Sequence, residues 1–146
     1  MSGSNLLTEE SPSVQAHLQI MQGVISRMAA NSTASKAWCI TIVSAILVLV
    51  ADKSKPEYAF IALVPIFLFL ALDSYYLALE KAFRDSYNSF INKLHAQDIC
   101  SEDLYSVAPK GNMTKHQLAA LRSFSVWGFY VCLGVMVYLA KELVLK

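Results

Sequence analysis

Three long runs of apolar residues alternate with polar segments along the chain. Residues 37–51 and 58–72 each contain fifteen residues without a charge, and residues 123–140 contain eighteen. At the α-helical rise, the third run spans about 27 Å, close to the thickness of the hydrocarbon core of a bilayer. The first run reaches that length with a few flanking residues, because Lys36 can extend its amine to the interface. The pattern predicts an all-α membrane protein with three transmembrane helices.

The second apolar run continues into a polar segment without a helix-breaking residue. Asp73 interrupts the run, which then resumes up to Leu79. No Gly or Pro follows before Asp98, and large apolar side chains recur every three or four residues. These side chains are Tyr76, Leu79, Phe83, Tyr87, Phe90 and Leu94. Because this is helical periodicity, we expect the second span to continue as a water-facing helix over residues 80–97.

An amphipathic helix is also predicted before the first span, over residues 13–33. Ser11 and Pro12 are typical of a helix start. The apolar residues that follow form a heptad seam, at Val14, Leu18, Met21, Ile25 and Met28. The helix could lie in the membrane surface or pack against the extension of the second span. We favour packing, because a surface helix usually carries several basic residues, whereas Arg27 is the only one before Lys36.

Two short polar segments lie outside the predicted helices. Residues 1–12 are expected to be disordered, because they are polar and terminal. Residues 52–57, with the sequence DKSKPE, form a turn between the two apolar runs. Six residues force the runs to be antiparallel, so residues 34–79 are predicted to form a transmembrane hairpin.

A second connection precedes the last span. Residues 98–113 contain a proline and a glycine near their end and are predicted to be a loop. Thr114 and Gln117 have the spacing of a capping box, in which the hydroxyl and the amide satisfy each other's free backbone groups. The third transmembrane helix is therefore predicted over residues 114–146.

Composition agrees with a membrane protein and excludes several functions. Hydrophobic residues make up 55% of the 146 residues and charged residues 16%, unlike the balance of soluble domains. A net charge of +1 argues against a protein that coats nucleic acid. The sequence has no Ser/His/Asp or Cys/His arrangement, phosphate-binding glycine loop or metal-spaced cluster. We therefore expect neither enzymatic activity nor a cofactor or metal ion.

Basic residues are distributed unevenly between the two sides of the predicted spans. The side with the N-terminus and residues 80–122 carries eight lysines and arginines, and the other side carries four. Basic residues are enriched on the cytoplasmic side of membrane proteins. We therefore expect a cytoplasmic N-terminus, a C-terminus on the opposite side, and cytosolic helices over residues 13–33 and 80–97.

Polar side chains inside the predicted spans are the first candidates for function. Asp73 is the only acidic residue within a span, and a hairpin in register would place it level with Lys36 and Arg122. A carboxylate in such a position is usually paired or functional. It could form a structural ion pair or helix cap, or it could act as a gate latch or an ion ring in an oligomer. Thr41 and Ser44 share one face of the first span, where they could permit close helix packing or line a pore.

A second set of candidates lies on the predicted cytosolic helices. The basic residues that could bind an anionic ligand, with a tyrosine as a stacking face, are Lys81, Arg84, Lys93, Lys115 and Tyr87. Within one chain Glu80 and Asp85 offset this patch, and a charged helix face is ordinarily a solvated one. Several copies of the patch around an oligomer axis would create a much stronger field.

Two segments of the sequence resemble a known class of protein. They are HLQIMQGVISRMAANSTASKAWCITIVSAIL and PEYAFIALVPIFLFLALDSYYLALEKAFRDSYN. Through them, residues 13–96 resemble small bacterial membrane effectors of nucleotide-signalling antiphage defence systems. The size and layout are similar to the channel effectors of Hailong systems, which an oligodeoxyadenylate made by the partner enzyme keeps closed. The third span, residues 123–140, departs from a plain two-helix effector module.

The resemblance implies a location and a ligand class. The location is the bacterial inner membrane, with the C-terminus in the periplasm. The ligand is an oligonucleotide or cyclic nucleotide made by a partner enzyme. No individual ligand-binding residue follows from the resemblance, because no binding motif can be aligned.

Two hypotheses for function follow from these features. Three spans cannot enclose a pore within one chain, so conduction requires a homo-oligomer, by analogy a tetramer. The first hypothesis is a pore-forming antiphage effector that is gated by a nucleotide or oligonucleotide on its cytosolic helices and depolarises the inner membrane when open. The alternative is a non-conducting membrane anchor or accessory subunit that recruits a cytosolic partner.

Overall fold

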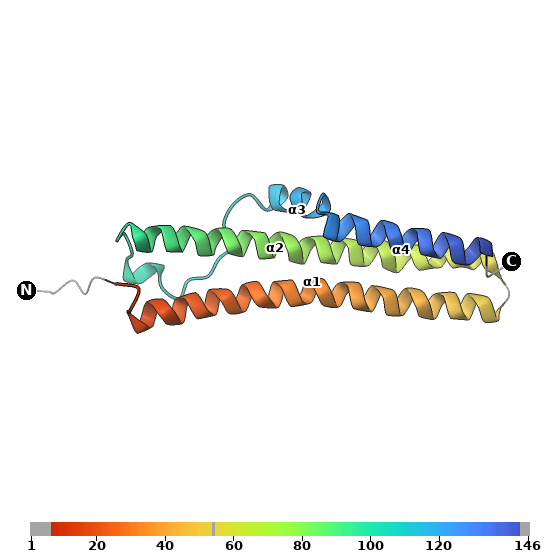
Figure 1. Cartoon of the computed structure of the whole chain (residues 1–146), viewed down its shortest axis with the longest axis horizontal. Helices are drawn as coiled ribbons and strands as arrows, with labels where there is room; N and C mark the ends of the chain where they lie inside the picture. Colours follow the sequence, from red (N-terminus) through yellow and green to blue (C-terminus); the bar gives the residue numbers. More distant parts are fainter. Residues whose placement is uncertain (1–6, 54, 144–146) are drawn as a thin grey trace, which may run out of the picture.

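The computed structural model of the protein describes residues 7–53 and 55–143 as helices joined by short connections and one loop (Figure 1). The elements in chain order are α1 (Pro12–Asp52), the 3₁₀ helix η1 (Pro56–Ala62), α2 (Leu63–His95), the 3₁₀ helix η2 (Ser101–Asp103), α3 (Met113–Leu121) and α4 (Phe124–Leu143). No strand occurs within the described ranges. Three helices, namely α1, η1 with α2, and α4, are long and apolar enough to cross a membrane. The predicted all-α class with three membrane-spanning helices is confirmed.

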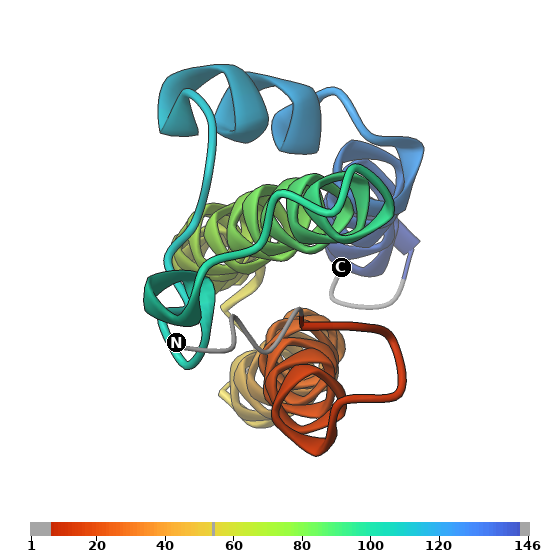
Figure 2. The same cartoon turned by 90° about the vertical axis from the view of Figure 1, so that its left-hand side faces the viewer.

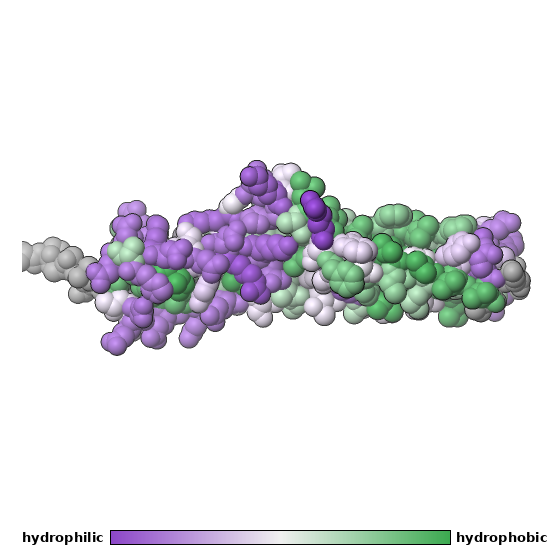
Figure 3. All heavy atoms as spheres, turned by 45° about the horizontal axis from the view of Figure 1, so that its top comes forward, coloured by the Kyte–Doolittle hydropathy of each residue, from purple (hydrophilic) through white to green (hydrophobic). Residues whose placement is uncertain are grey.

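α1 and α2 form a long antiparallel hairpin that sets the length of the molecule (Figure 1). α1 has 41 residues and is about 60 Å long, twice the hydrocarbon thickness of about 30 Å. Along this length, the surface has one hydrophilic half and one hydrophobic half (Figure 3). We call residues 12–35 and 74–122 the polar half, and residues 36–53, 55–73 and 123–143 the apolar half.

α4 completes the apolar half by packing against the hairpin. Its buried residues recur at helical spacing, at Val126, Tyr130, Leu133 and Val137. They form one core with buried residues of α1, η1 and α2, namely Cys39, Val43, Ala62 and Ile66. At the far end, Lys141 Nζ lies 5.0 Å from the ring centroid of Phe60. Only 22% of the most apolar window of each span is buried within the chain, which leaves most of this surface to lipid or to another copy.

A second core joins the polar parts of α1 and α2. Val14 and Met21 of α1 are buried against Phe90 and Leu94 of α2. Partly buried residues of the loop over residues 96–112 cover this core, namely Ile99, Leu104 and Val107. The expectation that the N-terminal helix packs on the extension of the second span is therefore confirmed.

The N-terminal helix and the first span form one helix. The domain boundary that the sequence places at residue 34 falls within α1, which continues unbroken through it. The small polar residues here include no Gly or Pro. Ser35 donates its hydroxyl to the carbonyl oxygen of Asn31, one turn earlier, at 2.9 Å. Because such hydroxyls are satisfied within the helix, the helix continues.

The third predicted helix, residues 114–146, is divided into α3 and α4. The backbone N–H of Ser123 bonds to the carbonyl oxygen of Ala120, three residues back, at 3.0 Å. This tighter bond ends α3, and the chain changes direction before α4 begins. Viewed along the bundle, α3 runs across the other helices (Figure 2). The prediction was wrong because no Gly or Pro marks the break in the sequence.

Other predicted boundaries shift by a few residues. Asn112 is the N-cap of α3, and its side chain accepts hydrogen bonds from the N–H groups of Thr114 and Lys115. The capping box predicted at Thr114 was therefore placed two residues too late. Of the predicted disordered N-terminus, residues 1–6 lie outside the described ranges, and Ser11 donates its N–H to the carbonyl oxygen of Thr8 at 3.0 Å. The end of the third predicted helix, residues 144–146, is also outside them.

Replacing Ala78 by Leu should destabilise the bundle. Ala78 of α2 is fully buried, and extra methylenes in a packed interior cost about 1–3 kcal/mol. The matched control is Ala71→Leu, because Ala71 lies on the same helix with its side chain exposed. Unfolding of the detergent-solubilised protein in SDS, followed by far-UV circular dichroism, should shift to lower SDS only for Ala78→Leu. Equal midpoints for the two variants would contradict the packing described here.

Candidate functional site

A buried polar cluster lies where the polar and apolar halves meet. Asp73 of α2 is fully buried. Its Oδ1 accepts a hydrogen bond from the hydroxyl of Ser32, and its Oδ2 lies 2.6 Å from Lys36 Nζ. Ser32 and Lys36 lie four residues apart on α1 and therefore share one face. We call these three residues the junction cluster.

The ion pair is the main stabilising contact of the Asp73 carboxylate. Oδ2 has no hydrogen bond of good geometry among the described residues, so the neighbouring Lys36 charge compensates its burial. Lys36 is itself largely buried, with 19% of its side chain exposed. Charges taken out of water need such compensation, because an unpaired buried ion is strongly destabilising.

α4 contacts α2 one turn away from the junction cluster. Tyr130 of α4 is buried, and its hydroxyl donates a hydrogen bond to the carbonyl oxygen of Phe69 at 3.0 Å. Phe69 precedes Asp73 by four residues. Polar contacts therefore connect all three long helices near the boundary between the two halves.

The predicted gate and pore residues do not all come together. Asp73 and Lys36 pair within one chain, and Arg122 lies at the end of α3 with its side chain exposed. Thr41 is also exposed, and its hydroxyl donates to the carbonyl oxygen of Ala37 at 3.0 Å. Ser44 is exposed and lines an apolar hollow of about 260 Å³ between α1 and α4. A gating role for these residues stays a prediction.

Two of the predicted ligand-binding residues line a common hollow in the polar half. Arg84 and Tyr87 of α2 border an open hollow of about 570 Å³, which we call the α1–α2 hollow. Its other lining residues include Gln22, Ser26 and Ala29 of α1 and Asn88 of α2. Gln22 donates its side-chain amide to the Tyr87 hydroxyl at 3.3 Å. Arg84 is paired with Glu80 at 2.8 Å but remains 61% exposed.

The other three predicted ligand-binding residues are directed elsewhere. Lys81 donates to the carbonyl oxygen of Ala119 at 3.2 Å. Lys93 lies 2.7 Å from Asp103 Oδ1, and their hydrogen bond raises the pKa of Lys93 and lowers the pKa of Asp103. Lys115 is exposed on α3. Within the described part of the single chain, the five residues therefore do not form one shared site.

His17 is a residue whose position the sequence did not predict. It follows the seam residue Val14 by three positions, and its side chain is 1% exposed. Its Nδ1 accepts a hydrogen bond from the backbone N–H of Tyr105 at 3.0 Å. Its ring lies 4.4 Å from the ring of Phe90. Burial lowers the pKa of His17, and the nearby Asp103 offsets this only in part, so the neutral ring holds the loop.

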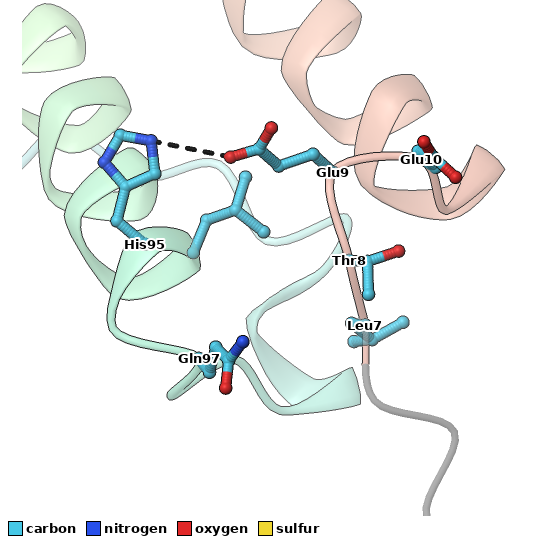
Figure 4. Close-up of a pocket in the computed structure, with 7 residues that line it drawn as sticks. Leu7, Thr8, Glu9, Glu10, His95 and Gln97 are labelled. Atoms are coloured by element: carbon cyan, nitrogen blue, oxygen red, sulfur yellow. Dashed lines mark ion pairs between the residues drawn. The ribbon is translucent and has the colours of Figure 1, made fainter.

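A second hollow lies at the tip of the polar half (Figure 4). It has a volume of about 500 Å³ and is lined by residues that precede α1 and residues that end α2. Glu9 Oε1 and His95 Nε2 lie 3.6 Å apart across it. Both side chains are more than half exposed, so water screens their interaction.

Comparisons with protein-family models, with curated proteins and with solved structures find no match to this chain. Within the described part of the chain, no group of three or more His, Cys, Asp and Glu residues could hold a metal ion. The junction cluster and the α1–α2 hollow are therefore the candidate sites that its own geometry provides.

Removing one member of the ion pair should cost more than removing both. Lys36→Met should destabilise the protein by about 3–5 kcal/mol, because it leaves the Asp73 carboxylate buried without a counter-charge. The double variant Lys36→Met, Asp73→Leu should recover most of that loss. The measurement is the SDS-unfolding midpoint of the purified protein. Arg84→Met is the control, because its exposed pair with Glu80 should contribute less than about 1 kcal/mol. Additive losses in the double variant would contradict the pairing.

Acidification should loosen the loop that His17 holds. Because its pKa is lowered in the folded state, the unfolded chain binds the proton more tightly. The free energy of unfolding should therefore fall as the pH drops below about 6.5, the ordinary histidine pKa. Because the pKa of Asp103 is lowered, protonation of Asp103 affects stability only at lower pH. His17→Asn, whose side-chain oxygen can replace Nδ1 as acceptor, should lose this dependence, and His95→Asn should keep it. Unfolding curves between about pH 7 and pH 5 test this, and a dependence retained in His17→Asn would exclude His17 as its source.

Proposed function

We propose that the protein is a homo-oligomeric, pore-forming membrane effector whose polar half responds to a nucleotide or oligonucleotide. The observation that supports this most is that α1 and α2 both pass from the polar to the apolar half without a break. A change in their spacing at one end therefore reaches the other end through two continuous helices. The proposed location is the bacterial inner membrane, with the polar half in the cytoplasm, the C-terminus in the periplasm and antiphage defence as the role.

The α1–α2 hollow is the proposed ligand site. Its volume of about 570 Å³ lies within the range of small-molecule sites. Arg84 can bind a phosphate in a bidentate manner, in competition with Glu80, and Tyr87 can stack on a base. Because α1 and α2 line opposite sides of the hollow, a bound ligand would change their separation. To move the protein from 99% open to 99% closed, the ligand must bind one state more tightly by about 5.5 kcal/mol.

The proposed pore lies between copies of the chain. Thr41 and Ser44 of α1 are exposed to the outside of the bundle, where neighbouring copies can bring them around a common axis. A tetramer is proposed by analogy with the resembling effectors. Opening of the Lys36–Asp73 pair would expose one positive and one negative charge near the mouth of such a pore.

A membrane anchor that recruits a cytosolic partner is the second candidate. Two observations favour it: Asp73 and Lys36 compensate each other within one chain, and the Thr41 hydroxyl is bonded within its own helix. These groups therefore need no aqueous pore. In this alternative, the hollows of the polar half would bind the partner.

Ion flux from proteoliposomes distinguishes the two candidates. The full chain should dissipate a potassium gradient, and short oligodeoxyadenylates or cyclic dinucleotides should change the rate. Thr41→Leu with Ser44→Leu should lower the flux by about tenfold, because an apolar constriction dewets. Ile42→Leu, at an exposed position on another face of the same helix, should not.

The ligand arm of the same experiment uses Arg84. Arg84→Gln should weaken the nucleotide effect by about tenfold or more, the value of one charge-assisted hydrogen bond, and leave the basal flux unchanged. Lys53→Gln, at the opposite end of α1, is the control for loss of a positive charge. An absence of flux with and without nucleotides would overturn the pore and leave the anchor.

A further inference from the structure

The charged side chains on the outward face of α3 are all basic. From Leu104 to Lys141 the chain has four basic residues and no acidic one. Two of the four, Lys115 and Arg122, belong to α3 and its C-cap. An acidic residue in contact with α3, Asp85 of α2, lies 3.4 Å from His116 Nε2, on the side of α3 that faces α2. This leaves the charge of Lys115 and Arg122 directed outward.

α3 has two distinct faces. Ala120 is fully buried, and His116, one turn earlier, is only partly exposed. Lys115, Leu118 and Arg122 are three and four residues apart and are all exposed on the other face. They border a shallow hollow of about 470 Å³. Leu118 is 58% exposed, so an apolar side chain lies between two cations.

The C-terminal end of α3 lies at the edge of the apolar half. Arg122 precedes Phe124 by two residues, so their Cα atoms are at most about 7 Å apart. Phe124 is the first residue of α4 and is 76% exposed. Its ring packs edge-on against Trp127 at 5.4 Å. Exposed aromatic residues of this kind are typical of the membrane–water interface.

The contact between α3 and α2 lies on the polar side of that edge. Lys81 donates to the carbonyl oxygen of Ala119 and follows Asp73 by eight residues, about 12 Å along the helix. α3 is inclined to the long axis of the bundle (Figures 1 and 2). It therefore runs from the polar half to Arg122, next to the first residue of α4.

We infer that α3 lies in the headgroup layer of the bilayer and that Lys115 and Arg122 bind the phosphate of an anionic phospholipid. A basic, short helix with exposed apolar side chains suits this layer, and Arg122 can hold a phosphate in a bidentate manner. Leu118 and Phe124 contact the acyl chains of the same leaflet. Lys115 is thereby assigned to lipid rather than to the nucleotide. The inference does not depend on conduction and applies equally to a membrane anchor.

Quenching of Trp127 by brominated lipids tests the inference. The full chain carries Trp38→Phe, so that Trp127 is the only tryptophan, and is reconstituted in phosphatidylcholine vesicles. A small fraction of brominated phosphatidylglycerol should quench Trp127 more than the same fraction of brominated phosphatidylcholine. Lys115→Gln with Arg122→Gln should reduce this preference by about fivefold for each charge removed. Lys53→Gln with Lys55→Gln, at the opposite end of the bundle, should leave it unchanged.

The outcomes separate lipid from other anions. Inorganic phosphate at constant ionic strength should not remove the preference; its removal would indicate a site for soluble anions and would overturn the inference. An equal preference in the Lys115→Gln, Arg122→Gln variant and its parent would also overturn it, as would no preference in the parent.

A depth measurement keeps the inference testable if that variant does not fold. Leu118→Trp, with Trp38→Phe and Trp127→Phe, places the only tryptophan on α3. Bromines near the headgroup end of the acyl chains should quench it more than bromines near the chain ends. Quenching by a soluble agent with none by either lipid would place α3 in water and overturn the inference.

Discussion

A buried carboxylate that must be neutralised determines how α1 and α2 are aligned. Lys36 lies sixteen residues before the end of α1 at Asp52, and Asp73 lies seventeen residues after Pro56. The two arms of the hairpin therefore match in length, and the ammonium meets the carboxylate across them. A shift by one turn would leave both charges buried without a partner, which costs several kcal/mol. The pair thus selects one register where the surrounding apolar side chains would accept several.

The two cores depend on that register in different ways. In the polar half, the same register places Val14 and Met21 against Phe90 and Leu94, and the loop covers them. In the apolar half, the core also includes α4, where burial alone provides little specificity because lipid is as apolar as the interior. Polar contacts such as that of Tyr130 with Phe69 therefore contribute disproportionately to specificity there.

The spans, the hairpin and the level of Asp73 and Lys36 could be predicted from the sequence, because hydropathy and equal arm lengths determine them. The burial of His17 could not, since its partner is a backbone N–H of Tyr105, 88 residues away. The break between α3 and α4 also could not, because Arg122 and Ser123 are compatible with a helix and only the tertiary arrangement interrupts it. The sequence indicates that basic residues gather in the polar half. Their individual partners, which are Glu80, Asp103 and a backbone carbonyl oxygen, could not be predicted, because helical periodicity does not give the distances between side chains.

The position of the ion pair along α1 gives the hairpin unequal lever arms. From Lys36 to Pro12 the helix runs about 36 Å, and from Lys36 to Asp52 about 24 Å. If a straight α1 pivots at the junction cluster, a displacement at Pro12 moves the opposite end, at Asp52, by about two thirds of that distance. The force at Asp52 is correspondingly greater. The helix geometry therefore favours small, forceful displacements within the bilayer over large ones.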